Sequence, residues 1–292
     1  MMRENDNTQD FITYPKTFEK YRWYKPVFVF ILLLIFYIIF NILVDYISAA
    51  IYGKAVVDAI INGGYEVMDT PLGEILTDIK VIMFIPALFL ACKIVGDRPF
   101  SSFVSSRGGW NYRLYFKALI IPFIFTMLSF GVDTLINGAD PDAIYSFSIL
   151  YLLVSLIAVP LQCIAEEYVF RGFFLQTFGS WFKIPVLAIV LQSIVFTAIH
   201  GYDDIGLIEI FVCGCIFGFM AWKTNGIEVS SAMHTAYNFS ICLFSMFGIA
   251  ASSSTTEIND FILEIILDVF MFVLIYYVGK KTDWYGELKE TP

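Results

Sequence analysis

Residues 165–174 read AEEYVFRGFF, and they directly follow the apolar run SFSILYLLVSLIAVPLQCI at 146–164. This run is long enough to enter a bilayer, because about 20 apolar residues span the hydrocarbon core. Glu166, Glu167 and Arg171 therefore fall where the chain is expected to lie in hydrocarbon. A charge at the centre of a membrane costs at least about 2.5–3.5 kcal/mol. The three residues thus predict an intramembrane site with a functional or structural purpose.

The whole chain has the composition of a membrane protein. Of its 292 residues, 58% are hydrophobic and only 15% are charged, whereas soluble domains carry roughly 25% charged residues. Apolar runs recur along the sequence and predict an all-α, polytopic integral membrane protein with about eight transmembrane helices and a central polar site. The predicted spans are 26–52, 72–95, 114–136, 147–178, 184–201, 206–222, 227–250 and 260–279.

The distribution of basic residues predicts the orientation of these spans. Most of the 18 Lys and Arg residues fall before the first span, after the last span, and in alternate loops. Cytoplasmic loops collect Lys and Arg, so both termini are expected in the cytoplasm, with the helices in the cell (plasma) membrane. No basic stripe suggests a nucleic-acid partner, and no signal peptide is evident.

The two histidines of the chain also lie in apolar stretches. His200 ends QSIVFTAIH at 192–200, and His234 opens HTAYN at 234–238. Ionisable residues within a membrane usually face the interior of a helix bundle or a water-filled cavity. Because His234 and Asn238 are four residues apart, an α-helix places them on one face.

Helical spacing also separates the roles of the acidic pair. Glu167 and Arg171 are four residues apart and can form an ion pair, while Glu166 is turned by about 100° from its neighbour. Glu166 is therefore expected to meet the histidines. This requires a long fourth helix, loosened at Pro160.

The chemistry of these residues leaves three interpretations open. They could form a catalytic site, an ion pair and hydrogen bonds that only hold helices together, or the proton relay of an ion-coupled transporter.

Three motifs on successive predicted helices resemble those of one family. EEYVFR (166–171), FTAIH (196–200) and HTAYN (234–238) match the patterns EExxxR, FxxxH and HxxxN. The chain resembles the CPBP family, which includes type II CAAX prenyl endopeptidases and the bacteriocin-processing or immunity proteins called Abi. The resemblance covers roughly residues 147–250 and implies an intramembrane endopeptidase.

The resemblance also implies a role for each matching residue. Glu166 would activate water as general base, helped by His200, and His234 with Asn238 would stabilise the oxyanion. Glu167 and Arg171 would support the site. The implied organisation is a cytoplasmic tail at 1–25, three transmembrane helices within 26–136, a CPBP/Abi-like catalytic core of four helices at 147–250, a last helix at 260–279 and a cytoplasmic tail at 280–292.

Cofactor and substrate follow from the same resemblance. No metal is favoured, because the chain has no HExxH sequence; in a zinc alternative, Glu166, His200 and His234 would be the ligands. The expected partners are membrane lipid and a peptide or membrane-protein substrate, either a CAAX-type prenylated peptide or a bacteriocin leader-like peptide. A non-catalytic membrane scaffold or bacteriocin-immunity protein of the same fold is the alternative, followed by an ion-coupled transporter.

Overall fold

The computed structural model describes residues 10–63, 65–251 and 258–282. Within these ranges the chain is helical and contains no strand, apart from isolated bridges between Ser105 and Gly226 and between Tyr145 and Phe247. The predicted all-α fold is therefore confirmed. Parts of both predicted tails, residues 1–9 and 283–292, lie outside the described residues.

The long helices coincide with the predicted apolar segments. They are α1 (Lys25–Tyr52), α3 (Pro71–Ile82), α4 (Phe84–Val95), α5 (Tyr112–Asn137), α6 (Ile149–Glu167), α8 (Pro185–Thr197), α9 (Asp204–Lys223), α10 (Glu228–Met246) and α11 (Ile258–Thr282). Shorter elements join them: η1 (Tyr14–Thr17), α2 (Lys54–Ile61), η2 (Tyr65–Asp69), η3 (Phe100–Phe103), the π-helix η4 (Tyr168–Leu175) and α7 (Gln176–Phe182).

Among the described residues, six helical segments are long and apolar enough to cross a membrane. They are Lys25–Tyr52, Pro71–Val95, Tyr112–Asn137, Ile149–Phe182, Asp204–Lys223 and Phe261–Thr282. The other two predicted spans are helical but differ in kind. Helix α8 is short, and α10 carries serines, His234 and Asn238 among its apolar residues. Eight crossings therefore stay a prediction, whereas an integral membrane protein with several apolar helices is established.

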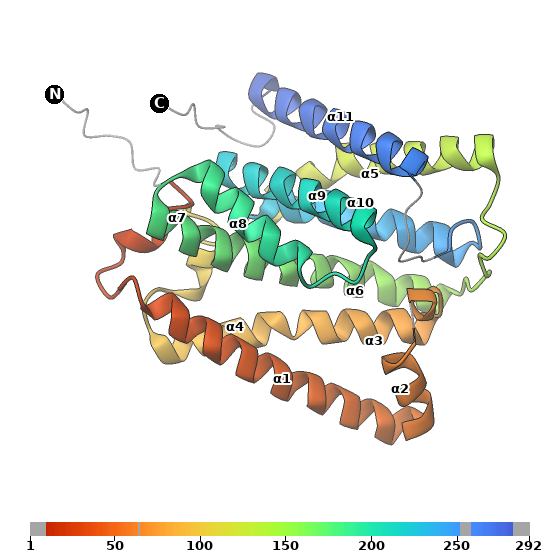
Figure 1. Cartoon of the computed structure of the whole chain (residues 1–292), viewed down its shortest axis with the longest axis horizontal. Coiled ribbons are helices and arrows are strands. Elements are labelled where there is room, and N and C mark those ends of the chain that lie inside the picture. The colour runs from red at the N-terminus through yellow and green to blue at the C-terminus, as the bar shows by residue number, and fades with distance from the viewer. Residues whose placement is uncertain (1–9, 64, 252–257, 283–292) are drawn as a thin grey trace.

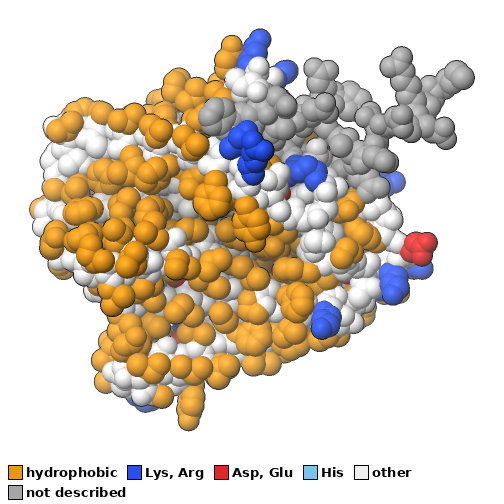
Figure 2. Space-filling model, turned by 180° about the vertical axis from the view of Figure 1, so that it is seen from behind, with side chains coloured by type: hydrophobic (Ala, Val, Ile, Leu, Met, Phe, Trp, Pro, Cys, Tyr) orange, Lys and Arg blue, Asp and Glu red, His pale blue; other side chains and the backbone are white. Residues whose placement is uncertain are grey.

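The chain runs back and forth along the bundle (Figure 1). One end of the bundle, at the left of Figure 1, carries the start of α1, the α4–α5 connection, α7, the α9–α10 connection and the end of α11. Figure 2 shows most Lys and Arg side chains toward the corresponding side and apolar side chains over the rest of that face. The basic segments predicted to share one side of the membrane thus share one end of the molecule. Which side of the membrane this end faces stays a prediction.

Helix α10 forms the centre of the bundle and contacts α5, α6 and α9. Its Val229, Ala232 and Met233 are fully buried against Leu114 and Tyr115 of α5. The neighbouring helices also remove the polar groups of α10 from lipid, where an unsatisfied polar group would cost several kcal/mol. The low hydropathy of α10 is therefore explained by its position inside the protein.

Helix α6 continues through η4 into α7 as one helical segment of 34 residues, Ile149–Phe182. The predicted long fourth helix is therefore confirmed. The predicted loosening at Pro160 is wrong, because α6 passes through that proline as an α-helix. The departure from α-helical geometry is the π-helix η4, which begins directly after Glu167. Such π segments are rare and frequently occur at functional sites.

Gly172 explains how η4 fits into the bundle. A Cβ atom at this position would lie 2.5 Å from the carbonyl oxygen of Phe103 in η3. Only glycine therefore allows η4 and η3 to approach this closely.

The segment before α1 packs against the bundle. Phe11 and Ile12 are fully buried in a core cluster with Leu175 and Ile189. The described part of the predicted N-terminal tail is thus part of the folded structure.

Candidate active site

The centre of the site is the imidazole of His234, which lies between two carboxylates of α6. His234 Nδ1 is 3.2 Å from Glu167 Oε1, and His234 Nε2 is 3.6 Å from Glu166 Oε2. All three side chains are buried. Because adjacent residues of a helix point in different directions, Glu166 and Glu167 can face the two nitrogens of one ring. The carboxylates therefore fix the orientation of the imidazole.

Arg171 supports this arrangement from behind. Its Nη1 lies 2.9 Å from Glu167 Oε1, and both side chains are fully buried. The guanidinium Cζ is 4.4 Å from the centre of the Phe196 ring and 5.2 Å from that of Phe217. The predicted ion pair is thus present, and two aromatic rings stabilise its cation. Phe217 also stacks on the His234 ring, with 5.3 Å between centroids.

Gln162 connects Glu166 to Asn238. Its Nε2 donates to Glu166 Oε1 at 2.9 Å, and its Oε1 accepts from Asn238 Nδ2 at 3.2 Å. Sequence analysis missed Gln162. Its signal was a polar residue in an apolar run, one helical turn before Glu166. Asn238 is therefore connected to the acidic pair in two ways. The Gln162 amide links it to Glu166, and His234, on the same helix, contacts both carboxylates.

His200 lies outside a helix, which corrects the predicted span at 184–201. Helix α8 ends at Thr197, and His200 follows in the turn. Its Nδ1 lies 2.7 Å from the carbonyl oxygen of Phe196. A carbonyl oxygen only accepts, so this hydrogen bond requires a proton on Nδ1 and leaves Nε2 as an acceptor. The helix end explains the geometry, since the last carbonyls of a helix lack partners within it.

The Phe196 ring lies close to both imidazoles. Its centroid is 4.6 Å from that of His200 and 6.2 Å from that of His234. Since it also contacts Arg171, the first residue of the FTAIH motif packs the parts of the site together.

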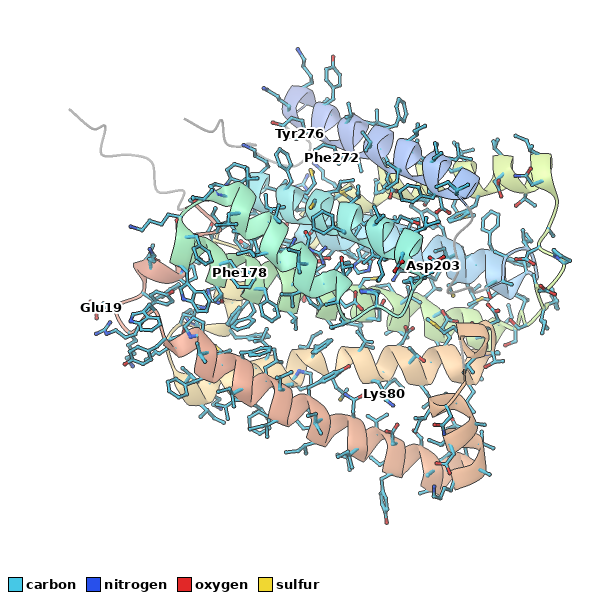
Figure 3. All side chains as sticks on the ribbon, in the orientation of Figure 1. Glu19, Lys80, Phe178, Asp203, Phe272 and Tyr276 are labelled. Atoms are coloured by element: carbon cyan, nitrogen blue, oxygen red, sulfur yellow. The ribbon has the colours of Figure 1, made fainter. Side chains whose placement is uncertain are left out.

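The four predicted catalytic side chains line one cleft of about 1250 Å³, and they are Glu166, His200, His234 and Asn238. Its lining includes residues of the connections that lie away from the basic end: Gly63, Val67, Asp140, Tyr202 and Ala251. Asp203, labelled in Figure 3, accepts a hydrogen bond from Gly206 N at 2.8 Å and so fixes the start of α9. The cleft can therefore admit a ligand to the buried site.

The zinc alternative, with Glu166, His200 and His234 as ligands, stays a prediction. Among the described residues, no three His, Cys, Asp or Glu side chains are grouped to hold a metal ion. Glu166, His200 and His234 line the same cleft. The Nδ1 atoms of the two histidines face a backbone carbonyl and a carboxylate, which are also the usual partners of the second nitrogen in metal-bound histidines. No step of the mechanism proposed below passes through a metal.

Residues 146–240 match the family described as type II CAAX prenyl endopeptidase, Rce1-like. This segment carries an Rce1-like domain. It contains all three motifs and the side chains around His234 described above, from Gln162 to Asn238, so the resemblance inferred from the motifs is confirmed over these residues.

A curated relative extends beyond this domain. Over 191 residues the chain is 29% identical to YyaK of Bacillus subtilis (strain 168), described as an uncharacterized protein. The match covers 61% of this chain and 63% of YyaK. No solved structure matches the chain significantly.

Proposed function

We propose that this protein is an intramembrane endopeptidase in which Glu166 activates water to cleave a peptide bond of a membrane-associated substrate. The observation that carries the proposal is the position of His234. It lies between Glu166 and Glu167 in a cleft that Asn238 and His200 also line. The Rce1-like domain supports the same reaction class.

Glu166 and His200 act on the water molecule. The Glu166 carboxylate accepts one proton from water, and the free Nε2 of His200 accepts a hydrogen bond from the other hydrogen. The resulting hydroxide attacks the carbonyl carbon of the substrate, and the electron pair of the C=O bond moves to its oxygen. Proton transfer of this kind contributes roughly 10²–10⁴-fold to enzymatic rates.

His234 and Asn238 stabilise the charge that develops on that oxygen. Asn238 offers the Nδ2–H that is not donated to Gln162. His234 offers Nε2–H, which requires the imidazolium form because its Nδ1–H is donated to Glu167. Fixed donors act most strongly in a buried site of this kind. The tetrahedral intermediate then collapses, the C–N bond breaks, and Glu166 returns its proton to the leaving amine. Gln162 holds the Glu166 and Asn238 side chains in their relative positions during both steps through its two hydrogen bonds.

Glu167 and Arg171 are positioning residues. Glu167 accepts from His234 Nδ1 and keeps the ring oriented, while Arg171 compensates the charge of Glu167. The substrate is proposed at two levels of detail. The general class is a membrane-associated peptide; the specific candidates are a CAAX-type prenylated peptide and a bacteriocin leader-like peptide.

The test is a comparison of protein termini by mass spectrometry. Membranes of cells that carry the wild type, Glu166→Gln or Asp45→Asn are compared at matched expression. Asp45 pairs with Lys80 at 3.0 Å, away from the cleft, so Asp45→Asn is the control for a lost carboxylate. Termini present with wild type and Asp45→Asn but absent with Glu166→Gln support the proposal and identify a substrate. Identical termini in all three, with the variants inserted, favour a non-catalytic scaffold or immunity protein.

A further inference from the structure

The cleft that contains Glu166 has an acidic lining. Besides Glu166, its carboxylates come from α3, α9, α11 and the loop before α6, and they are Glu74, Asp78, Asp140, Glu209, Glu264 and Asp268. Among the described residues that line it, none is Lys or Arg. A cleft lined by one sign of charge between low-dielectric walls concentrates ions of the opposite sign. The lining therefore favours a cationic ligand.

Several of these carboxylates already have partners within the protein. Glu74 accepts a hydrogen bond from the Tyr151 hydroxyl. Glu209 Oε1 accepts from the Tyr237 hydroxyl at 3.4 Å, and Asp268 Oδ2 accepts from the Cys213 thiol at 3.0 Å. Each of these hydrogen bonds joins two neighbouring helices, so these three carboxylates have a role in helix packing.

Asp78 differs from them. Its side chain is only 6% exposed, and its Oδ2 atom has no hydrogen-bond partner. Glu74, one helical turn earlier, and Glu166 line the same cleft as Asp78. An unpaired carboxylate is costly to bury, and like charges nearby add to that cost. A ligand that brings a positive charge to Oδ2 would relieve both.

The position of Asp78 suggests what brings that charge. Helix α3 packs against α6, and Asp78 of α3 lines the same cleft as Glu166 of α6. A peptide that occupies this cleft with its scissile bond at Glu166 can therefore bring a side chain to Asp78. A metal ion needs several ligands, and among the described residues no three His, Cys, Asp or Glu side chains are grouped to supply them, so Asp78 suits an ammonium or guanidinium group better.

We propose that Asp78 forms a subsite for a basic side chain of the peptide substrate. This inference rests on the proposed function, because it places a peptide in the cleft. It makes Asp78 a specificity-determining residue, which pairs with a Lys or Arg near the scissile bond.

Binding tests the subsite separately from catalysis. Purified Glu166→Gln protein in lipid nanodiscs is titrated with fluorescent apolar peptides that carry one Lys or, at the same position, one norleucine, with the position varied along the peptide. At one or two neighbouring positions, the Lys peptide is expected to bind roughly tenfold more tightly, the usual scale of a charge-assisted hydrogen bond. Adding Asp78→Asn to the Glu166→Gln protein should remove this preference for Lys and leave the affinity for the norleucine peptide unchanged. Asp78→Glu should restore it, and Asp45→Asn should not affect it.

Two outcomes would overturn the subsite. One is equal binding of Lys and norleucine peptides at every position, which requires no Asp78 variant and so does not depend on whether one folds. The other is a Lys preference that persists in folded Asp78→Asn protein. The proposed function fails differently: if wild type cleaves none of the peptides that bind, while the Lys preference depends on Asp78, the subsite stands and the endopeptidase proposal does not.

Discussion

Replacing Arg171 with Met should destabilise the protein strongly. Arg171 and Glu167 are both fully buried and 2.9 Å apart, so Arg171→Met leaves an uncompensated carboxylate inside the bundle. Breaking a buried pair in this way costs about 3–5 kcal/mol. The contacts of the guanidinium with Phe196 and Phe217 add up to about 2 kcal/mol. The free energy of unfolding should therefore fall by at least about 3 kcal/mol.

Removing both charges should cost much less. In the double variant Glu167→Gln/Arg171→Met no buried charge is left without its partner, and exchange of a buried ion pair for neutral residues is often close to neutral. The amide introduced by Glu167→Gln can still hydrogen-bond His234. The double variant is thus predicted to be more stable than Arg171→Met alone, although it carries one more substitution.

Unfolding in mixed micelles, followed by titration with a denaturing detergent, measures these differences. The pair of Lys80 and Asp45 is the matched control: Lys80 lies between α1 and α3 in Figure 3, and its partner is one-third exposed. Lys80→Met should cost about 1 kcal/mol or less, as for other partly exposed pairs. The reasoning is refuted if Arg171→Met costs no more than Lys80→Met, or if the double variant is less stable than Arg171→Met.

Three further predictions concern other parts of the molecule. Gly172→Ala should lower the free energy of unfolding by about 1–3 kcal/mol, because the added Cβ would meet the Phe103 carbonyl oxygen. Gly131→Ala is the control and should not lower it, because no atom lies within 4 Å of the added Cβ. Equal unfolding free energies for the two variants would contradict the packing of η4. Zinc chelation should leave the rate of peptide cleavage unchanged, and loss of activity that added zinc restores would contradict a direct role of Glu166. In a background with the native cysteines replaced, Asp140→Cys should react with an impermeant maleimide from outside intact cells and Lys183→Cys should not; the reverse would invert the predicted orientation.

Much of the fold could be predicted because a membrane helix is recognisable from the apolar run of its own sequence, without knowledge of its neighbours. Each apolar run is helical near its predicted bounds, and the pairing of Glu167 with Arg171 follows from a spacing of four residues. The burial of α10 was less accessible, because its position depends on contacts with α5, α6 and α9. Hydropathy alone treats such an inner helix as one more membrane span.

The main residues of the site could be predicted from the sequence, but the contacts between them could not. The motifs named Glu166, His200 and His234, whereas the location of His200 beyond the end of α8 depends on where that helix stops. Gln162 was missed because an isolated polar residue in a helix has no distinctive spacing. Asp78 was missed because it comes from α3, outside the resemblance, and only packing of α3 on α6 brings it to the cleft.

The rate of peptide hydrolysis by purified protein tests the central claim most directly. A peptide that spans a cleavage site found in membranes is incubated with wild type or with Glu166→Gln, both reconstituted in liposomes and both shown to be folded. If Glu166 activates water, Glu166→Gln should lower kcat by roughly 10²–10⁴-fold with little change in KM. A variant that retains more than a tenth of the wild-type kcat would contradict the proposed role of Glu166.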